Sequence, residues 1–391
     1  MKRFSAQYII TGTGSILKRG IITTDDEGLI TDVTDTGGSL PELQNTAFYN
    51  GIISPGFVNC HCHLELSAMK GMLPGKQGLG KFIRDVRDKR TMAADKLKHA
   101  RIADREMYDS GISACADICN TPDTFRIKDE SAIVYLNLLE VFGIDPGRIE
   151  KRLQDITLLK GEASGYRTSS YIVPHSLYSL SSGLLVELLK ITRENRVTSI
   201  HFMESDAEKE FLSHCTGSIA ESYKSMGITG EMLTDRVRDH ISGILSMVTL
   251  SGNLLLVHNT FSGSEEIDRV MERGNTFWCL CPSSNIYIEN SLPPVQLLRD
   301  RGAKIVLGTD SLASNSRLSI LEEMKLIASG NRGIPLGEII IWATANGAEA
   351  LDLSESLGTI ETGKRPGLVL LENISLEDMA LTPEVTARRL I

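Results

Sequence analysis

Five of the eight histidines in this chain stand at or directly after short apolar runs that have the composition of β-strands. They are His61, His63, His175, His201 and His258. Residues i and i+2 of a strand point to the same face, so the imidazoles of His61 and His63 could reach one metal ion. An H-x-H pair by itself is a weak signal, and two partly buried histidines that close a strand are the alternative.

Further candidate ligands recur along the chain. His201 lies in the run 198–202, and Asp310 follows the run 304–307. A divalent ion such as zinc accepts neutral imidazoles and a carboxylate oxygen and keeps a position for water, whose pKa it lowers to about 7. We therefore predict one divalent metal ion, with zinc as the expected ion and iron as the alternative. Its ligands would be His61, His63, His201 and Asp310.

Three more side chains near these ligands could move protons or bind substrate. Glu204 lies three residues after His201, and we expect it to shuttle a proton. A surface glutamate is the alternative. His258 could orient or deprotonate an attacking water, and His175 could bind substrate, although either could be a buried barrel histidine. Asp310 would also accept a proton from the water, with a capping role at a turn as its alternative.

The cysteines favour a reducing compartment. Seven cysteines is an odd number, and the N-terminal residues lack the apolar stretch of a signal peptide. We expect reduced thiols and a cytoplasmic location. Cys60 and Cys62 alternate with the two histidines, so we expect both to point to the opposite face as small core residues. We interpret Cys279 and Cys281 in the same way.

Eight apolar runs rich in β-branched residues must position these side chains. They cover residues 53–60, 112–118, 132–139, 171–174, 198–202, 254–257, 275–280 and 304–307. Helical patterns lie between them, at 80–108, 149–159, 182–194, 264–273, 294–301 and 318–328, with another beyond 335. Eight repeated βα units predict an α/β fold, a (β/α)8 TIM-type barrel. Active sites of such barrels lie at the carboxyl ends of the strands, where the candidate residues stand.

Both ends of the chain have β-type patterns outside the barrel. Short strands surround an acidic, glycine-ended turn at 25–28, and a further strand is expected at 368–371. So small a meander needs a partner. We predict a small β-sandwich domain formed by residues 1–54 and 356–391, beside a barrel domain of residues 55–355.

The segment 208–252 is longer than an ordinary connection between barrel elements. Its pattern predicts extra helices, which could form a lid over the site or a surface excursion. His99, His214 and His240 fall in helical or inserted segments, where we expect solvated side chains.

The charge balance restricts the partners. A formal net charge of -9 and a pI near 5.5 argue against binding to a nucleic-acid backbone, which requires a basic patch. No apolar run approaches the roughly 20 residues of a membrane span. We expect a small-molecule substrate and no nucleic-acid or membrane partner, and a homodimer is left open.

Taken together, the motifs resemble the amidohydrolase superfamily. The resemblance is carried by Pro55-Gly56-Phe57-Val58-Asn59-x-His61-x-His63, Pro174-His175, His201-x-x-Glu204, Val257-His258-Asn259 and Leu307-Gly308-Thr309-Asp310-Ser311-x-Ala313-Ser314-Asn315. The most similar branch holds cytosine, guanine, S-adenosylhomocysteine, methylthioadenosine and aminofutalosine deaminases and the triazine chlorohydrolases. The run His63-Leu64-Glu65-Leu66-Ser67 is similar to that of aminofutalosine-type deaminases and makes Glu65 a candidate substrate-binding residue.

The resemblance implies a mononuclear metal site with the four ligands named above, with Glu204 as proton shuttle and His258 as the histidine of the sixth strand. Binuclear relatives use a carboxylated lysine at the end of the fourth strand. This chain has His175 there, which favours one ion.

The expected reaction is hydrolytic deamination of a heteroaromatic amine. Hydroxide on the metal would attack the carbon that bears the amino group while Glu204 protonates the adjacent ring nitrogen. An adenine-containing nucleoside or thioether derivative is the expected substrate. Hydrolysis of a cyclic amide, displacement of a ring chloride and an inactive binding scaffold remain as alternatives. The side chains whose position relative to the pocket stays open are Arg84, Arg87, Arg90, Glu140, Tyr178 and Phe261.

Overall fold

Each of the eight predicted runs contains a barrel strand, although residues 53–55 of the first run pair in the small sheet of the chain ends. The computed structural model describes residues 1–39, 41–248, 252–272 and 274–391. The barrel strands are β6 (Phe57–Cys62), β7 (Ile112–Cys119), β8 (Val134–Val141), β9 (Ser169–Pro174), β10 (Val197–Phe202), β11 (Asn253–His258), β12 (Thr276–Leu280) and β13 (Lys304–Leu307). Strands β6 to β9 form one four-stranded parallel sheet, and strands β10 to β13 form another.

The two sheets meet at two seams, both at the carboxyl ends of the strands. At one seam the backbone N–H of His201 donates to the carbonyl oxygen of His175 over 2.8 Å. At the other, the backbone N–H of Asp310 donates to the carbonyl oxygen of His61 over 3.1 Å. Isolated parallel bridges lie at the same two places. These contacts close the predicted (β/α)8 barrel, and predicted site residues form the seams themselves.

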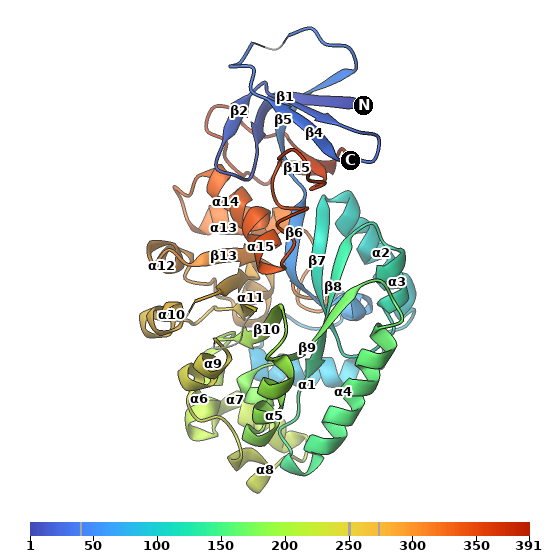
Figure 1. Cartoon of the computed structure of the whole chain (residues 1–391). Coiled ribbons are helices and arrows are strands. Elements are labelled where there is room, and N and C mark those ends of the chain that lie inside the picture. The colour runs from blue at the N-terminus through green and yellow to red at the C-terminus, as the bar shows by residue number, and fades with distance from the viewer. Residues whose placement is uncertain (40, 249–251, 273) are drawn as a thin grey trace.

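Helices surround the strands (Figure 1). They are α1 (Leu79–Lys89), α2 (Lys96–Asp109), α3 (Phe125–Glu130), α4 (Ile149–Ala163), α5 (Ser182–Thr192), α10 (Ser264–Met271), α11 (Pro282–Glu289), α12 (Val295–Asp300), α13 (Ile320–Gly330), α14 (Leu336–Ala343) and α15 (Ala345–Ala350), with 3-10 turns η1 (Leu64–Met69), η2 (Pro146–Arg148) and η3 (Leu177–Ser179). The predicted helix 80–108 is two helices, because Asp95 adopts a left-handed conformation with φ of 51°. Residue 273 of the predicted helix 264–273 lies outside the described residues.

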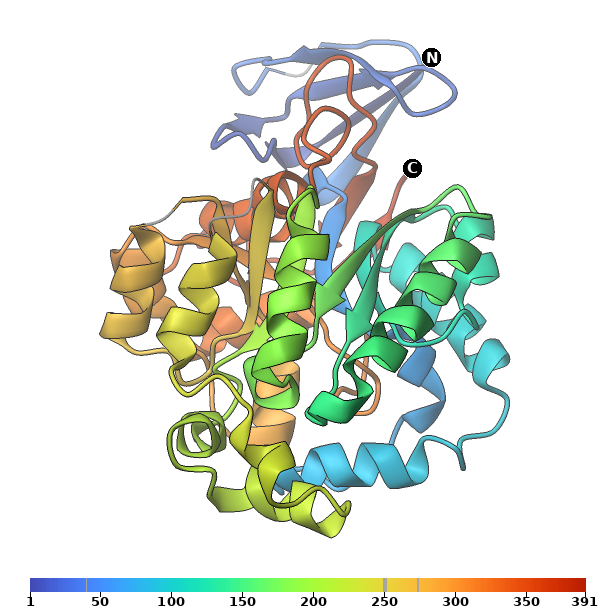
Figure 2. The ribbon, with the colours of Figure 1, turned by 60° about the horizontal axis from the view of Figure 1, so that its bottom comes forward.

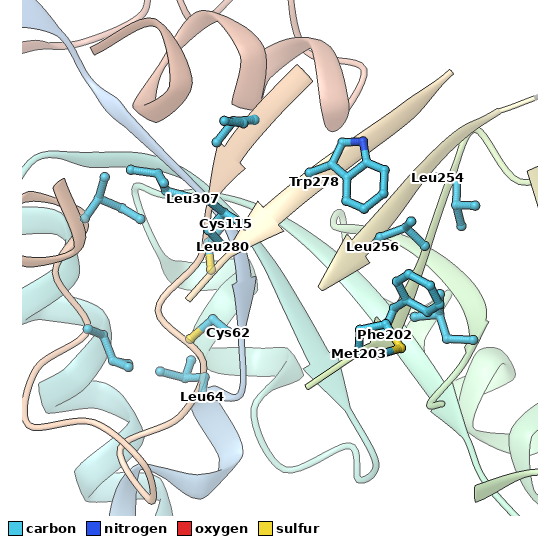
Figure 3. Packing of buried hydrophobic residues seen from close by; sticks show 14 of the residues in the cluster. Cys62, Leu64, Cys115, Phe202, Met203, Leu254, Leu256, Trp278, Leu280 and Leu307 are labelled. Atoms are coloured by element: carbon cyan, nitrogen blue, oxygen red, sulfur yellow. The ribbon is translucent and has the colours of Figure 1, made fainter. Parts of the chain in front are cut away.

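Two apolar layers hold the barrel together. An inner cluster takes side chains from all eight strands, among them Val58, Leu138 and Val257. A larger cluster fills the space between strands and helices, and Figure 3 shows part of it around Trp278 and Leu256. Trp278 is fully buried, and burying a large apolar side chain contributes roughly 1.5–3 kcal/mol.

The prediction that Cys60 points away from the histidines is wrong. Cys60 belongs to the inner cluster, together with Cys279 of the neighbouring sheet. The register of β6 shifts between Asn59 and Cys62, so the strict alternation of sides fails within this strand. Cys62 does lie on the outer side, among the residues that Figure 3 labels. All four cysteines discussed above are buried free thiols, as predicted for small core residues.

The two chain ends form a separate small sheet. Its strands are β1 (Lys2–Ile10), β2 (Ile16–Lys18), β3 (Ile21–Thr24), β4 (Ile30–Thr34), β5 (Thr46–Pro55), β14 (Leu368–Glu372) and β15 (Thr386–Arg389). Strand β14 pairs antiparallel with β5, which confirms that the C-terminal strand returns to the N-terminal ones. Figure 1 shows both termini at this end of the molecule. The exact domain boundaries stay a prediction.

The segment 208–252 supplies most of a helical group at the opposite end, as predicted. Its helices are α6 (Asp206–His214), α7 (Gly217–Ser225), α8 (Glu231–Thr234) and α9 (His240–Val248), and its residues 249–251 lie outside the described ones. Helix α7 packs against α1 (Figure 2). There the hydroxyl of Ser222 donates a hydrogen bond to the carbonyl oxygen of Gly80. Within the described residues, none of the helices has both the length and the apolar character that a membrane span requires.

The three histidines expected to be solvated divide into two kinds. His99 and His214 are exposed, as predicted. The prediction is wrong for His240, whose side chain is only 15% exposed. Its Nε2 lies 2.9 Å from Glu266 Oε1, which also pairs with Lys209 at 2.8 Å. This contact between α9 and α10 withdraws the imidazole from solvent.

Candidate metal and catalytic site

The four predicted metal ligands converge at the carboxyl end of the barrel. Nε2 of His61 and Nε2 of His63 are 3.1 Å apart. Asp310 Oδ1 lies 3.5 Å from Nε2 of His63 and 3.8 Å from Nε2 of His61. The ring of His201 is centred 4.8 Å from that of His61. The ligand atoms of His61, His63 and Asp310 therefore form one cluster, and those of His61, His201 and His258 form an overlapping one.

This donor set fits a divalent cation. Burial, together with the neighbouring His63, lowers the pKa of His61 well below its usual value, and burial does the same for His201. Both rings are therefore neutral near pH 7, which is the form that binds a metal. Burial alone would raise the pKa of Asp310, but the facing imidazoles lower it to about 2. Neutral imidazoles and an anionic carboxylate are ligands that zinc accepts.

Hydrogen bonds on the far side of the ligands fix which atoms face the centre. Nδ1 of His201 lies 2.8 Å from the carbonyl oxygen of His175, to which it must donate, so its Nε2 carries the free lone pair. Asp310 Oδ2 accepts hydrogen bonds from the hydroxyls of Ser284 and Ser314, both over 2.6 Å. Only Oδ1 of Asp310 is thus left to face the imidazoles.

The backbone is strained at three of these strand ends. Met203, His258, Asn259 and Asp310 have φ of 51°, 77°, 57° and 54°. A left-handed conformation costs a residue with a side chain roughly 1–2 kcal/mol. Such strain persists where the surroundings demand it and gathers at functional sites. Here the left-handed residues turn the backbone directly after β10, at the end of β11 and after β13. The turns at β11 and β13 set the directions of His258 and Asp310.

Glu204 and His258 form an acid–base pair beside the ligands. Oε1 of Glu204 lies 3.7 Å from Nε2 of His258. Burial, and then the charges of Asp310 and Glu289, raise the pKa of Glu204 well above its usual value. The shift favours the protonated form of this carboxyl group. Burial lowers the pKa of His258, whose Nδ1 lies 2.9 Å from the side-chain oxygen of Asn285. The neutral ring thus directs the Nε2 lone pair toward Glu204.

The two predicted substrate-binding residues have different surroundings. His175 lies beside the ligands, with its ring centred 4.6 Å from that of His201. Both carboxylate oxygens of Glu65 are already engaged. Oε1 accepts from Arg90 over 2.6 Å, and Oε2 accepts from the backbone N–H groups of Asn120 and Thr121 over 3.2 and 3.1 Å. Glu65 therefore ties loops together, and its role in substrate binding stays a prediction.

Several side chains around the site were not singled out from the sequence. Ser284 and Asn285 lie on α11, whose start at Pro282 directly follows β12 and Cys281. The run Pro282-Ser283-Ser284-Asn285 after a barrel strand is the signal that could have found them, because a strand end leads into the site. Among the open candidates, Glu140 lies at the site, with Oε1 3.7 Å from Nδ1 of His201.

The chain matches known proteins over nearly its whole length. The model of the amidohydrolase family matches residues 52–387. A 5-methylthioadenosine/S-adenosylhomocysteine deaminase of Thermodesulfovibrio yellowstonii is 26% identical, over 94% of this chain and 84% of the relative. A 5'-deoxyadenosine deaminase of Methanococcoides burtonii is 26% identical, over 90% and 79%. The crystal structure of Helicobacter pylori aminofutalosine deaminase with methylthio-coformycin has a TM-score of 0.81 at 21% identity, covering 95% of this chain and 92% of that one.

Proposed function

This chain belongs to the amidohydrolase family, and from that premise we propose that it deaminates an adenine-containing nucleoside or thioether derivative hydrolytically. The family uses a divalent metal. The observation that carries the proposal is the buried Glu204, 3.7 Å from His258 and next to the four predicted ligands, with a pKa that burial raises above its usual value. Relatives that share about a quarter of their residues with this chain carry the names of adenine-nucleoside deaminases, which supports the substrate class.

The metal centre would be held by His61, His63, His201 and Asp310, and we propose zinc as its ion. When bound, the ion would supply a water acidic enough to attack the carbon that bears the amino group. Asp310 can accept a proton from that water at Oδ1, because Oδ2 is occupied by two serine hydroxyls.

Glu204 would act as the acid of the reaction. Its protonated carboxyl can donate to the ring nitrogen next to the attacked carbon, so that negative charge does not accumulate there. His258, held by Asn285, would orient the water and accept a hydrogen bond at Nε2. The need for a ring-nitrogen donor is what favours deamination over cleavage of a cyclic amide or displacement of a ring chloride at the same centre.

The test is ammonia release by the purified zinc-loaded protein from adenosine, methylthioadenosine, S-adenosylhomocysteine, aminofutalosine, guanine and cytosine. We expect turnover of at least one adenine compound. Glu204→Gln should lower kcat by about 100- to 10,000-fold, the usual contribution of a general acid, while zinc content stays at one ion per chain. Glu221→Gln, an exposed change on α7, is the matched control. Silence on every adenine compound would overturn the substrate class, and full activity of E204Q would remove its role.

A further inference from the structure

The carboxylate of Glu140, in β8, has one satisfied oxygen and one unsatisfied oxygen. Its side chain is 3% exposed. Oε2 accepts a hydrogen bond from the side-chain amide of Asn120 over 3.0 Å. Oε1 is buried and has no hydrogen-bond partner among the residues that the structure describes. A buried acceptor without a donor is costly, so a donor from a bound molecule would complete this group.

The neighbouring imidazoles cannot complete it. Nδ1 of His201 is 3.7 Å from Oε1 and already donates to the carbonyl oxygen of His175. Nδ1 of His175 lies 2.9 and 2.8 Å from the hydroxyls of Ser176 and Ser179. Each of these nitrogens therefore has a partner elsewhere, and the donor that Oε1 lacks must come from outside the described chain.

A network of loops holds Glu140 in this position. Asn120, which donates to Glu140, is itself fixed through its backbone N–H to Oε2 of Glu65. The hydroxyl of Thr121 donates to the same oxygen over 3.0 Å, and Arg90 donates to the other. The segments after β6 and β7 thus brace the end of β8. This arrangement gives Glu65 a supporting role behind a binding residue.

The position of Glu140 indicates which part of a substrate it meets. The ring of His201 lies between the rings of His258 and His175, at centroid distances of 5.3 and 4.6 Å. Glu204 pairs with His258 on one side, and Glu140 lies on the other, beside His175. If the amine reacts at Glu204, Glu140 faces the part of the molecule beyond the heteroaromatic ring.

We infer that Oε1 of Glu140 accepts a hydrogen bond from a ribose hydroxyl, so that the site selects ribonucleosides over free bases and deoxynucleosides. This inference rests on the proposed function. A second metal ion held by Glu140, His175 and His201 is the competing occupant, because their ligand atoms also lie close together. It is disfavoured because Nδ1 of His201 carries a hydrogen that it donates to a carbonyl and has no lone pair to offer.

The experiment removes the acceptor from the protein and, separately, the hydroxyl from the substrate, and compares the two effects. The zinc-loaded full chain and its Glu140→Leu variant are compared on adenosine, 2'-deoxyadenosine and 3'-deoxyadenosine. In the wild-type protein, loss of the bound hydroxyl should lower kcat/KM by about 10- to 100-fold, as expected when a buried acceptor is left without its donor. In E140L, adenosine should fall to the level of the deoxy substrate, and zinc should stay at one ion per chain. Glu150→Leu, an exposed change at the start of α4, is the control.

Each of the other possible outcomes shows whether the proposed function or only the inference is wrong. A wild-type protein silent on every nucleoside overturns the proposed function together with the inference. The inference alone is wrong if nucleosides are substrates but the ratio of kcat/KM between adenosine and the deoxy substrates is the same in the wild type and E140L. A second zinc ion that E140L loses would assign Glu140 to a metal site and also overturn it. If E140L fails to fold, Glu140→Gln replaces it, because glutamine has nearly the same shape as glutamate. For the inference to stand, the ratio of kcat/KM between adenosine and the deoxy substrates must be smaller in E140Q than in the wild type.

Discussion

Two buried glutamates, Glu204 and Glu208, follow β10 and are four residues apart in the chain. The backbone N–H of Glu204 donates to Oε2 of Glu208 over 3.2 Å, and Glu208 is fully buried in the first turn of α6. Burial, followed by the charge of Glu204, raises the pKa of Glu208 to about 8. A neutral Glu208 adds no second negative charge behind Glu204, so it leaves the proton-donating form of Glu204 undisturbed.

Glu208 should therefore make stability depend on pH. The folded state holds its proton up to about pH 8, whereas the ordinary pKa of the unfolded chain is 4.5. Stability is then full below pH 4.5 and falls as pH rises toward 8. Glu208→Gln, which is neutral at every pH, should remove roughly 2–4 kcal/mol of this decline between pH 5 and 8.5. Urea unfolding of both proteins at several pH values measures it. Parallel pH profiles for the two would contradict the assignment.

Residue types and spacing were sufficient to predict that the four candidate metal ligands converge, but other site residues depend on details of atomic contact. The histidines and Asp310 are rare residue types at strand ends, so a barrel pattern alone brings them together. Glu140 differs because its importance lies in one oxygen that lacks a partner. Whether an oxygen finds a donor depends on loops that are distant in sequence, and no local pattern records it.

At the scale of elements, the strands were predictable, whereas helices α3 and α11 were not. Each barrel strand is a run of β-branched and apolar residues, because both of its faces are covered. Helices α3 and α11 have six and eight residues and carry only a weak helical pattern, although α12, also of six residues, was predicted within 294–301. Yet α11 carries Ser284 and Asn285, which hold Asp310 and His258. The irregular register of β6 is likewise set by tertiary packing, not by its own composition.

The contact between α1 and α7 depends on a glycine. A Cβ placed on Gly80 would lie 2.5 Å from the backbone oxygen of Ser218, so a larger residue would push the two helices apart. Gly80→Ala should destabilise the protein by about 1–3 kcal/mol, the usual cost of overpacking. The sequence left a lid and a surface excursion open for the inserted helices, and a role as a lid would make KM rise as well. Urea unfolding and steady-state kinetics are the measurements.

Gly161 in α4 provides the matched control. It is exposed, and a Cβ there would meet no atom within 4 Å. Gly161→Ala should stabilise the protein by about 0.5–1 kcal/mol, because alanine restricts the unfolded chain and favours the helix. Opposite signs for the two glycine substitutions support the packing argument. Equal and small effects would show that α1 and α7 adjust freely to each other.

At the scale of the whole molecule, the candidate metal site lies where the two barrel sheets join. His61 lies in β6, the edge strand of one sheet, and His63 directly follows this strand. His201 lies in β10, the edge strand of the other sheet, and Asp310 follows β13, its opposite edge. An ion bound to all four side chains would cross-link both sheets. Closure of the barrel and formation of the site should therefore be coupled.

Removal of the metal should loosen the whole barrel. A ligand that binds only the folded state at about 1,000 times its Kd contributes roughly 4 kcal/mol, which should lower the Tm of the chelated protein by several degrees. Zinc, but not magnesium, should restore the Tm, because imidazole ligands suit zinc. Amide hydrogen exchange should rise most at the two seams, near His61 and His201, and little in the small terminal sheet. Calorimetry with and without chelator measures the shift, and an unchanged Tm after verified zinc loss would show that the protein closes the barrel without the ion.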